Sequence, residues 1–300
     1  MIEEEADINR RDHVGRTPLH IAILAGASEI ACDLTDAGAR MMARLVDGRT
    51  ALHLAAQLGL GHVVEKLLER SELNKEKVDK EAKSSETAAD EGGPMDVASA
   101  KKGDHEVINR EGVSEGVDAN VGIPEDDENE PDILDVNIPD WDYGFTPLGY
   151  AVVHGHLDVV DQLLVAGSDP LRPVKSNSNQ IPIVHPLSLT VLTKDEDVAC
   201  KIAERLIQAG AVSSTADTEL MSVFLRIVTA NRPRLLSTLF HADPKAKKLV
   251  NFPTIQDGKA IFPTTAAIMN HDFVTLALLL ANGAKVSFKD EDLDPARYAS

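Results

Sequence analysis

The sequence is poor in aromatic residues and in cysteine, and each scarcity narrows what the chain can be. Aromatic residues make up 4% of the 300 positions, so the core has to be built from Leu, Val, Ile and Ala, which suits small paired helices. The two cysteines, Cys32 and Cys200, lie among apolar residues of predicted helices. We interpret them as buried free thiols rather than as a disulfide or a reactive site, because cysteine is often buried and disulfides are rare inside cells.

Long apolar runs and positive charge are also scarce. No basic-then-apolar leader opens the chain, and no apolar run approaches the roughly 18 residues that a membrane-spanning helix needs. We therefore expect a soluble protein of the cytoplasm or nucleus that binds no membrane. The formal net charge is −19 and no face is rich in Lys or Arg, which argues against nucleic-acid binding through charge and favours a basic protein partner.

The residue patterns of catalytic, cofactor and metal sites are missing as well. There is no glycine-rich phosphate loop, no G-x-S-x-G sequence and no Cys/His pair suited to nucleophilic attack. His154-Gly155-His156 has no Cys or carboxylate at ligand spacing, so we interpret its histidines as structural. The acidic run Glu125–Glu130 lacks the alternating ligands of a calcium loop. We predict no enzyme activity, no cofactor and no metal.

What the sequence does contain is a recurring hexapeptide. Gly15-Arg16-Thr17-Pro18-Leu19-His20 returns 33 residues later as Gly48-Arg49-Thr50-Ala51-Leu52-His53, and again as Gly144-Phe145-Thr146-Pro147-Leu148-Gly149. A fixed period of this length is typical of a solenoid, in which each repeat contacts only its neighbours. Thr before Pro suits a helix start, since the hydroxyl accepts from backbone N–H groups and Pro needs no hydrogen bond at the first helical position.

T-P-L-H-x-A, followed by a Gly and a Leu-rich second helix, resembles the ankyrin repeat. The resemblance implies an all-α solenoid of antiparallel helix pairs with hairpin-like loops, whose tips and first helices form a concave binding face. It also implies that His20 hydrogen-bonds neighbouring turns and that Gly155-His156 is the turn between two helices. The residues that carry the structural motif are Thr17, Pro18, Leu19, His20, Thr50, Leu52, His53, Thr146, Pro147, Leu148, Gly155, His156 and Gly167.

Six repeats are predicted, and the distance from the first Pro to the final Gly, 20 residues in repeat one, serves as a ruler. Repeats one and two fill residues 1–72, repeats three to six fill residues 141–286, and residues 287–300 begin a connection. In repeat four the distance is 24 residues, which places four extra residues near 193–197 in the turn between its helices. In repeat five Asn231 stands in the glycine position.

Residues 73–140 form a predicted acidic insertion. Between Ser71 and Asp140 there are 21 acidic and 7 basic residues, and such a segment buries too little apolar area to offset its chain entropy. We expect order to end near Ser71 and the segment to be largely disordered. Residues 91–120 fit either a degenerate repeat or plain disorder. Upstream, Ala6–Asn9 is similar to the closing tail of an earlier repeat, so we hypothesise that the chain begins inside a longer array.

Partner binding is expected at the loop tips. Trp141, Tyr143 and Phe145 gather three aromatic residues within five positions, and binding hot spots favour Trp, Tyr and Arg. This cluster could equally fold back to close the insertion or pack on the next repeat, and the effect of Trp141→Ala on binding and on melting distinguishes the two. The candidate partner-binding residues are His13, Arg16, Asp47, Arg49, Trp141, Asp142, Tyr143 and Phe145.

The predicted function is a monomeric protein–protein interaction scaffold that binds its partner on the concave surface. One alternative is the non-catalytic ankyrin region of a larger enzyme, because the eroded late repeats are similar to those of large fungal multidomain proteins, including poly(ADP-ribose) polymerase-like ones. Another alternative is an inhibitor that acts through the acidic insertion.

Overall fold

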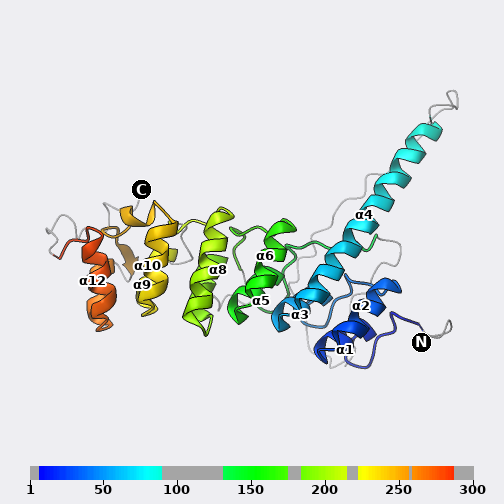
Figure 1. Cartoon of the computed structure of the whole chain (residues 1–300), viewed down its shortest axis with the longest axis horizontal. Helices are drawn as coiled ribbons and strands as arrows, with labels where there is room; N and C mark the ends of the chain where they lie inside the picture. Colours follow the sequence, from blue (N-terminus) through cyan, green and yellow to red (C-terminus); the bar gives the residue numbers. More distant parts are fainter. Residues whose placement is uncertain (1–6, 90–130, 175–183, 215–221, 257–258, 287–300) are drawn as a thin grey trace, which may run out of the picture.

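The computed structural model describes residues 7–89, 131–174, 184–214, 222–256 and 259–286. Its helices form antiparallel pairs that stack in chain order along one long axis, from α1 to α12 (Figure 1). The first helices of the pairs are α1 (Pro18–Leu24), α3 (Ala51–Leu58), α5 (Pro147–His154), α7 (Pro186–Leu189), α9 (Val223–Thr229) and α11 (Pro263–Met269). The second helices are α2 (Ser28–Asp36), α4 (Gly61–Ala89), α6 (Leu157–Val165), α8 (Glu196–Gln208), α10 (Pro233–Ala242) and α12 (Phe273–Ala281).

The stack has two layers. Each first helix packs against the first helix of the next pair, each second helix does the same, and the two helices of every pair pack against each other. This arrangement confirms the prediction of an all-α repeat solenoid. The remaining elements are short: the 3₁₀ turns η1 (Thr190–Leu192) and η3 (Ala246–Lys248), and a hairpin of β1 (Thr254–Gln256) with β2 (Lys259–Ile261).

The Thr-x-x-His motif starts the first helices as predicted. In repeat one the Thr17 hydroxyl lies 2.9 Å from His20 Nδ1, and the Thr17 N–H donates to that nitrogen over 3.2 Å. Thr50 and His53 repeat this capping box with distances of 2.9 and 3.1 Å. These bonds satisfy backbone groups that a helix start leaves without an intrahelical partner.

The turns inside five of the six described helix pairs, all but that of repeat four, contain a left-handed residue. Gly26, Gly59 and Gly155 supply it with φ of 69°, 69° and 80°. In repeats five and six the same place is taken by Asn231 (φ 55°) and His271 (φ 56°), as predicted for Asn231. A side chain raises the energy of this conformation, because its Cβ comes close to backbone atoms.

The four extra residues of repeat four lie in the turn between its two helices, as the Pro-to-Gly distance predicted. Helix α7 ends at Leu189, the η1 turn follows, and Thr193 and Asp195 lead into α8. The Thr193 hydroxyl donates to the Val152 carbonyl over 2.7 Å, which ties the longer turn to the preceding repeat. Asp195 then caps α8 by accepting from the Asp197 and Val198 N–H groups.

The core is a continuous row of small apolar side chains between repeats. Ile23, Ala56, Val152 and Val228 hold equivalent positions on the side of the first helices that faces the next repeat, and all four are fully buried. Ile268, the equivalent residue of the last helix pair, is 53% exposed among the described residues. Burial at this position therefore depends on the next repeat and not on the helix itself.

The prediction that order ends near Ser71 is wrong. Helix α4 has 29 residues and continues to Ala89, so it projects well beyond the stack (Figure 1). Residues 131–140 are also ordered and lie against repeats one and two. The boundaries of the acidic insertion remain a prediction. Residues 90–130, which include most of the expected disorder and the possible degenerate repeat 91–120, lie outside the described part of the chain, as do Ala6 and residues 287–300.

Candidate functional site

The loops before α1, α3 and α5 share one backbone pattern. The Asp12 N–H donates to the Arg16 carbonyl and the Leu45 N–H to the Arg49 carbonyl, each over 2.9 Å. In repeat three the equivalent bond joins Asp140 to Phe145, also over 2.9 Å. The third loop is therefore one residue longer than the first two, and its tip carries Asp142 and Tyr143.

Two arginine–aspartate pairs stiffen the first two loops. Arg16 pairs with Asp12 over 2.7 Å, and Arg49 pairs with Asp47 over 2.7 Å while also donating to Gln57 Oε1 over 2.7 Å. Hydrogen bonds from the Arg16 backbone, with its guanidinium, lower the pKa of Asp12 to about 2. Burial opposes ionisation of Asp47, but the hydrogen bonds from Arg49 still hold its pKa below the usual value. Both carboxylates are thus ionised at neutral pH.

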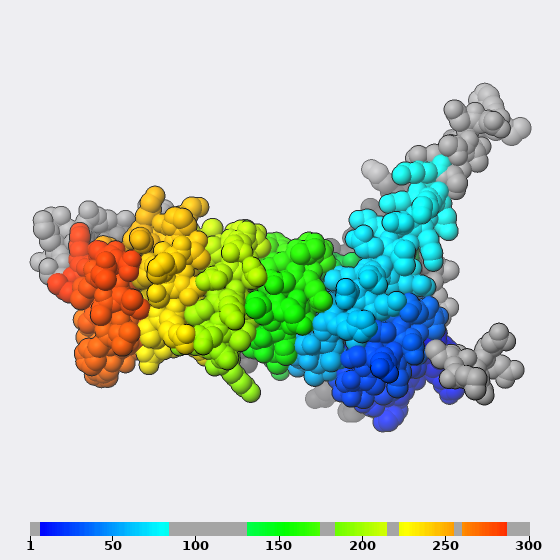
Figure 2. Space-filling model, in the orientation of Figure 1, coloured from blue at the N-terminus to red at the C-terminus, as the bar shows by residue number. Residues whose placement is uncertain are grey.

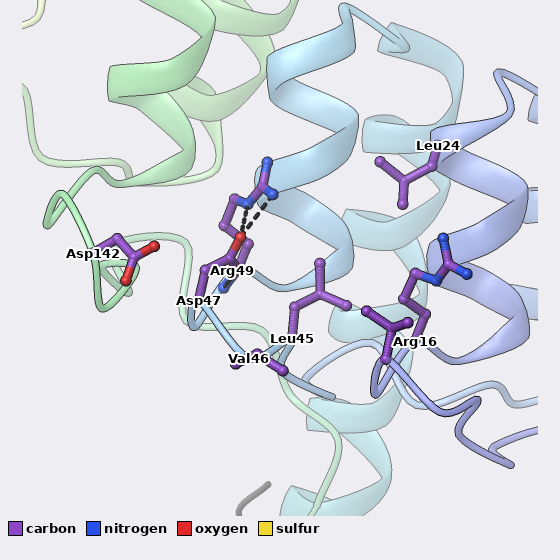
Figure 3. Close-up of a pocket in the computed structure, with 8 residues that line it drawn as sticks. Arg16, Leu24, Leu45, Val46, Asp47, Arg49 and Asp142 are labelled. Atoms are coloured by element: carbon purple, nitrogen blue, oxygen red, sulfur yellow. Dashed lines mark hydrogen bonds and ion pairs between the residues drawn. The ribbon is translucent and has the colours of Figure 1, made fainter. Parts of the chain in front are cut away.

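A pocket of about 290 Å³ opens between these loops and the end of α1 (Figure 3). Its apolar part comes from Val14, Leu24, Leu45 and Val46, of which only Leu45 is buried. Val46 is 56% exposed. The charged side chains that line the pocket are Arg16, Asp47, Arg49 and Asp142. The pocket offers an apolar surface framed by charges of both signs.

The structure sorts the candidate partner-binding residues into two groups. Arg16, Asp47, Arg49 and Asp142 all line this one pocket, whereas His13 is exposed outside it. The three aromatic candidates do not line it. Leu24 and Leu45 were missed in the sequence, although Leu24 directly follows the buried α1 residue Ile23 and so faces away from the core side.

Trp141 lies in the junction between repeats two and three. Its backbone N–H donates to the Asp47 carbonyl over 2.9 Å, and its ring centroid lies 5.2 Å from the Arg44 guanidinium carbon. Gly48 packs so closely on the ring that a Cβ there would lie 2.5 Å from Trp141 Cγ. For Trp141 these contacts support the alternative in which the cluster folds back to close the insertion; the repeat on which the ring packs is the preceding one, not the next.

Arg11 and Arg44 each connect two successive loops, because each guanidinium donates to a carbonyl of its own loop and to a carbonyl of the next. Arg11 donates to the Gly15 and Arg44 carbonyls over 2.8 and 2.7 Å, and Arg44 donates to the Gly48 and Pro139 carbonyls over 2.9 and 3.2 Å. Burial lowers the pKa of Arg44. The same arginine contact therefore continues across the gap between repeats two and three, although 95 residues separate Arg44 from Pro139.

Asp140 organises the third loop. Its buried carboxylate accepts from the Tyr143 and Gly144 N–H groups over 2.7 and 2.9 Å and from the Tyr150 hydroxyl over 2.7 Å. Burial, with the bond to Asp140, raises the pKa of Tyr150, so the phenol stays protonated and keeps donating. Tyr143 itself is 51% exposed, while Phe145 packs on Tyr150.

Histidines link the repeats through backbone atoms. Because the Thr50 N–H donates to His53 Nδ1, His53 carries its proton on Nε2 and donates it to the Phe145 carbonyl over 3.2 Å. Burial lowers the pKa of His53 to about 4, so the ring is neutral. His156 lies over Gly59, and its Nε2 is 3.1 Å from the Gln57 carbonyl. Gly149 replaces the capping His in repeat three, and Phe145 fills that space.

Other features of the described residues bear on the expected class of protein. Within the described ranges, no helix combines the length and apolar character that crossing a membrane requires. Cys32 and Cys200 are both free and partly buried, and burial raises the pKa of each thiol. A raised thiol pKa means less thiolate, the reactive form, and both side chains pack against the core.

Comparison with known proteins agrees with this geometry. The family model for ankyrin repeats in three copies matches residues 1–84, and the model for a single ankyrin repeat matches residues 143–173. The chain is 30% identical over 148 residues to the nuclear factor NF-kappa-B p105 subunit of Rattus norvegicus, which covers 49% of this chain and 14% of that protein. It is 41% identical over 69 residues to neurogenic locus notch homolog protein 1 of Xenopus laevis, covering 23% of this chain and 3% of that protein.

The chain thus spans only a small part of the curated relatives it matches. Among solved structures, the ankyrin repeat domain of Bcl-3 superposes with a TM-score of 0.56 at 18% identity, over 91% of this chain and 86% of that one. At this identity the likeness concerns the fold alone. The hexapeptide period, the two-layer stack and these matches have one explanation: residues 1–84 and 143–173 are ankyrin repeats, and the chain folds as an ankyrin-repeat stack.

Proposed function

We propose that this chain is an interaction scaffold that binds a partner protein at the pocket between the first two loops. Ankyrin repeats are protein–protein interaction domains. The observation that carries the proposal is the pocket itself, in which partly exposed Val14, Leu24 and Val46 lie between two ion-paired arginines. Exposed apolar surface framed by ordered polar groups is typical of contact sites.

The ion pairs prepare the pocket for binding. Because Arg16 and Arg49 are already held by Asp12 and Asp47, a partner that docks here does not have to immobilise long flexible side chains. An apolar anchor on the partner would enter between Val14 and Val46. The net charge of −19 supports a basic partner, whose approach this charge would accelerate.

We further propose that the chain binds as a monomer and acts in the cytoplasm or nucleus. The two free, partly buried cysteines support a reducing compartment, where thiols persist. The two alternatives, a region of a larger enzyme and an inhibitor that acts through its acidic insertion, concern residues outside this pocket. The pull-down described next also tests the inhibitor alternative.

The test is a pull-down with cross-linking and mass spectrometry on the full chain and on two variants. Val46→Asp places a carboxylate in the apolar part of the pocket and should abolish capture of the partner without changing the melting temperature. Ile30→Asp is the matched control, since Ile30 has the same exposure of 56% but lies on α2. The proposal is wrong if Val46→Asp retains the partner. Inhibition through the acidic segment would instead be lost on deletion of residues 91–129.

A further inference from the structure

The long second helix of repeat two creates a second surface, whose lining shares no residue with the loop pocket. α4 has 29 residues, whereas α2 and α6 have 9 each. The projecting part of α4, residues 72–89, extends away from the stack, as Figures 1 and 2 show. We call this part the arm.

The chain returns to the stack along the base of the arm. The Leu134 N–H donates to the Ser71 hydroxyl over 2.8 Å, and Asn74 donates to the Asp132 carbonyl over 2.9 Å. The Asp132 carboxylate in turn accepts from the Met41 and Met42 N–H groups over 2.8 and 2.9 Å. Ser71 stands where repeats one, three, four and six have their final Gly. The returning segment is therefore fixed to α4 and to repeat one at the same time.

Between the arm and the returning segment lies a groove of about 360 Å³. Ile133, Leu134 and Val136 form one wall, and Leu68 and Ala166 add to its apolar lining. Val165, next to Ala166 in the sequence, is 90% exposed, the largest exposed fraction among the large hydrophobic side chains of the described residues. Val165 does not line the groove itself, but its exposed side chain, one residue from the lining residue Ala166, leaves apolar surface in water that a partner in the groove can bury.

The wall formed by α4 carries a defined charge pattern. Glu72, Lys75 and Asp79 line the groove, and their spacing of three and four residues puts them on one face of the helix. Glu72 and Asp79 are seven residues apart, which is about 10.5 Å along a helix axis. A second helix packed beside the arm would complement this pattern if it carried two basic residues seven positions apart, opposite Glu72 and Asp79, and an acidic residue between them, opposite Lys75.

We propose that this groove, which we call the arm groove, is a second protein-binding surface that takes one amphipathic helix of a partner. The partner helix would place an apolar stripe against Ile133, Leu134 and Val136 and pair two Lys or Arg residues with Glu72 and Asp79. The shape fits helix-in-groove recognition, in which anchors recur at i, i+3 or i+4 and i+7. The charge pattern selects the direction and register of the helix, because a shifted helix would oppose like charges.

The test uses a synthetic amphipathic peptide with a Leu stripe and Lys, Glu and Lys at i, i+4 and i+7, and measures its fluorescence anisotropy with the full chain. The expected result is saturable binding that weakens about tenfold or more in Val165→Asp and in Glu72→Lys/Asp79→Lys. A peptide with reversed charges should bind the Glu72→Lys/Asp79→Lys variant better than it binds the wild type. Ile30→Asp and Asp33→Lys, on α2, are controls that should leave binding unchanged.

Three outcomes would overturn the proposal. Equal binding to all variants would mean that the peptide binds elsewhere. Binding only after deletion of residues 91–129 would mean that the chain itself fills the groove. Self-association that Val165→Asp abolishes would make a second copy the occupant. The loop-pocket variant Val46→Asp should leave peptide binding intact, so failure here is separate from failure of the proposed function.

Discussion

At the residue scale, the turns between paired helices differ in the residue that takes the positive-φ position. Repeats one to three have Gly there, whereas repeats five and six have Asn231 and His271. Asn231 could be predicted in the glycine position because the spacing of repeat five is kept. The spacing of repeat six puts His271 in the same position, eight residues after Pro263, but it was not singled out in the sequence because His is an unusual replacement for Gly; the structure shows its φ of 56°. Asn tolerates this conformation better than His, because its short polar side chain bonds locally.

Replacing His271 by Gly should stabilise the protein by about 1 kcal/mol, because Gly adopts positive φ without steric cost. Urea unfolding of the full chain measures the effect. Gly26→Ala is the reciprocal variant: no atom lies within 4 Å of the added Cβ, so it should destabilise by about 1 kcal/mol through the backbone alone. A lower midpoint for His271→Gly would contradict this interpretation.

The buried His53 should make stability depend on pH. Its pKa is about 4 in the folded chain and 6.5 in the unfolded reference, so below pH 6.5 the unfolded state binds a proton that the folded state does not. The contribution of neutral His53 to the free energy of unfolding is therefore fully present above pH 6.5 and is lost as the pH decreases toward 4. Urea midpoints at a series of pH values would show this, and His53→Gln should flatten the dependence. An equally steep dependence in His53→Gln would assign it to other groups.

At the element scale, the helix pairs could be predicted in detail and the arm could not. Thr-Pro starts and Gly ends are local signals, so the helices of repeats one, two and three begin where the hexapeptide puts them. The arm was missed because its many charges were interpreted as disorder. The same residues are strong helix formers, and Glu76 pairs with Lys80 one turn away over 3.3 Å. Once the docked half of α4 has nucleated the helix, such a sequence extends it at little cost.

The contribution of an equivalent side chain should depend on its place in the stack. Ile23→Ala removes a fully buried side chain and should destabilise by about 2 to 4 kcal/mol, whereas Ile268→Ala, at a 53% exposed position, should cost about 1 kcal/mol or less. Chemical denaturation of the two variants makes the comparison. Equal losses would mean that the forward face of α11 is covered as well as that of α1.

At the scale of the whole molecule, the interruption after repeat two lies in the sequence and not in the stack. Repeats two and three contact each other as repeats one and two do, through α3 with α5, α4 with α6, and the Arg44 bond to Pro139. The sequence indicated both halves from their motifs. It could not indicate that they dock, because the contacts join residues about 95 positions apart and no local pattern reports them.

The junction predicts different roles for two neighbouring aromatic residues. Trp141→Ala should destabilise by about 2 kcal/mol because the ring packs on Gly48 and Arg44. Tyr143→Ala, at a 51% exposed position, should change stability by less than about 0.5 kcal/mol. Thermal melting measures both. Unchanged melting of Trp141→Ala together with lost partner binding would instead place Trp141 in the interface.

The fluorescence of Trp141 tests the continuity of the stack most directly, because it is the only tryptophan in the chain and it lies at the junction. In the wild type its emission should be blue-shifted and protected from acrylamide. In Gly48→Val the added Cβ would lie 2.5 Å from Trp141 Cγ, so the emission should shift to the red and become quenchable while most helical circular dichroism remains. Identical emission and quenching in the two proteins would contradict the account, since repeats two and three would then not be docked through this contact.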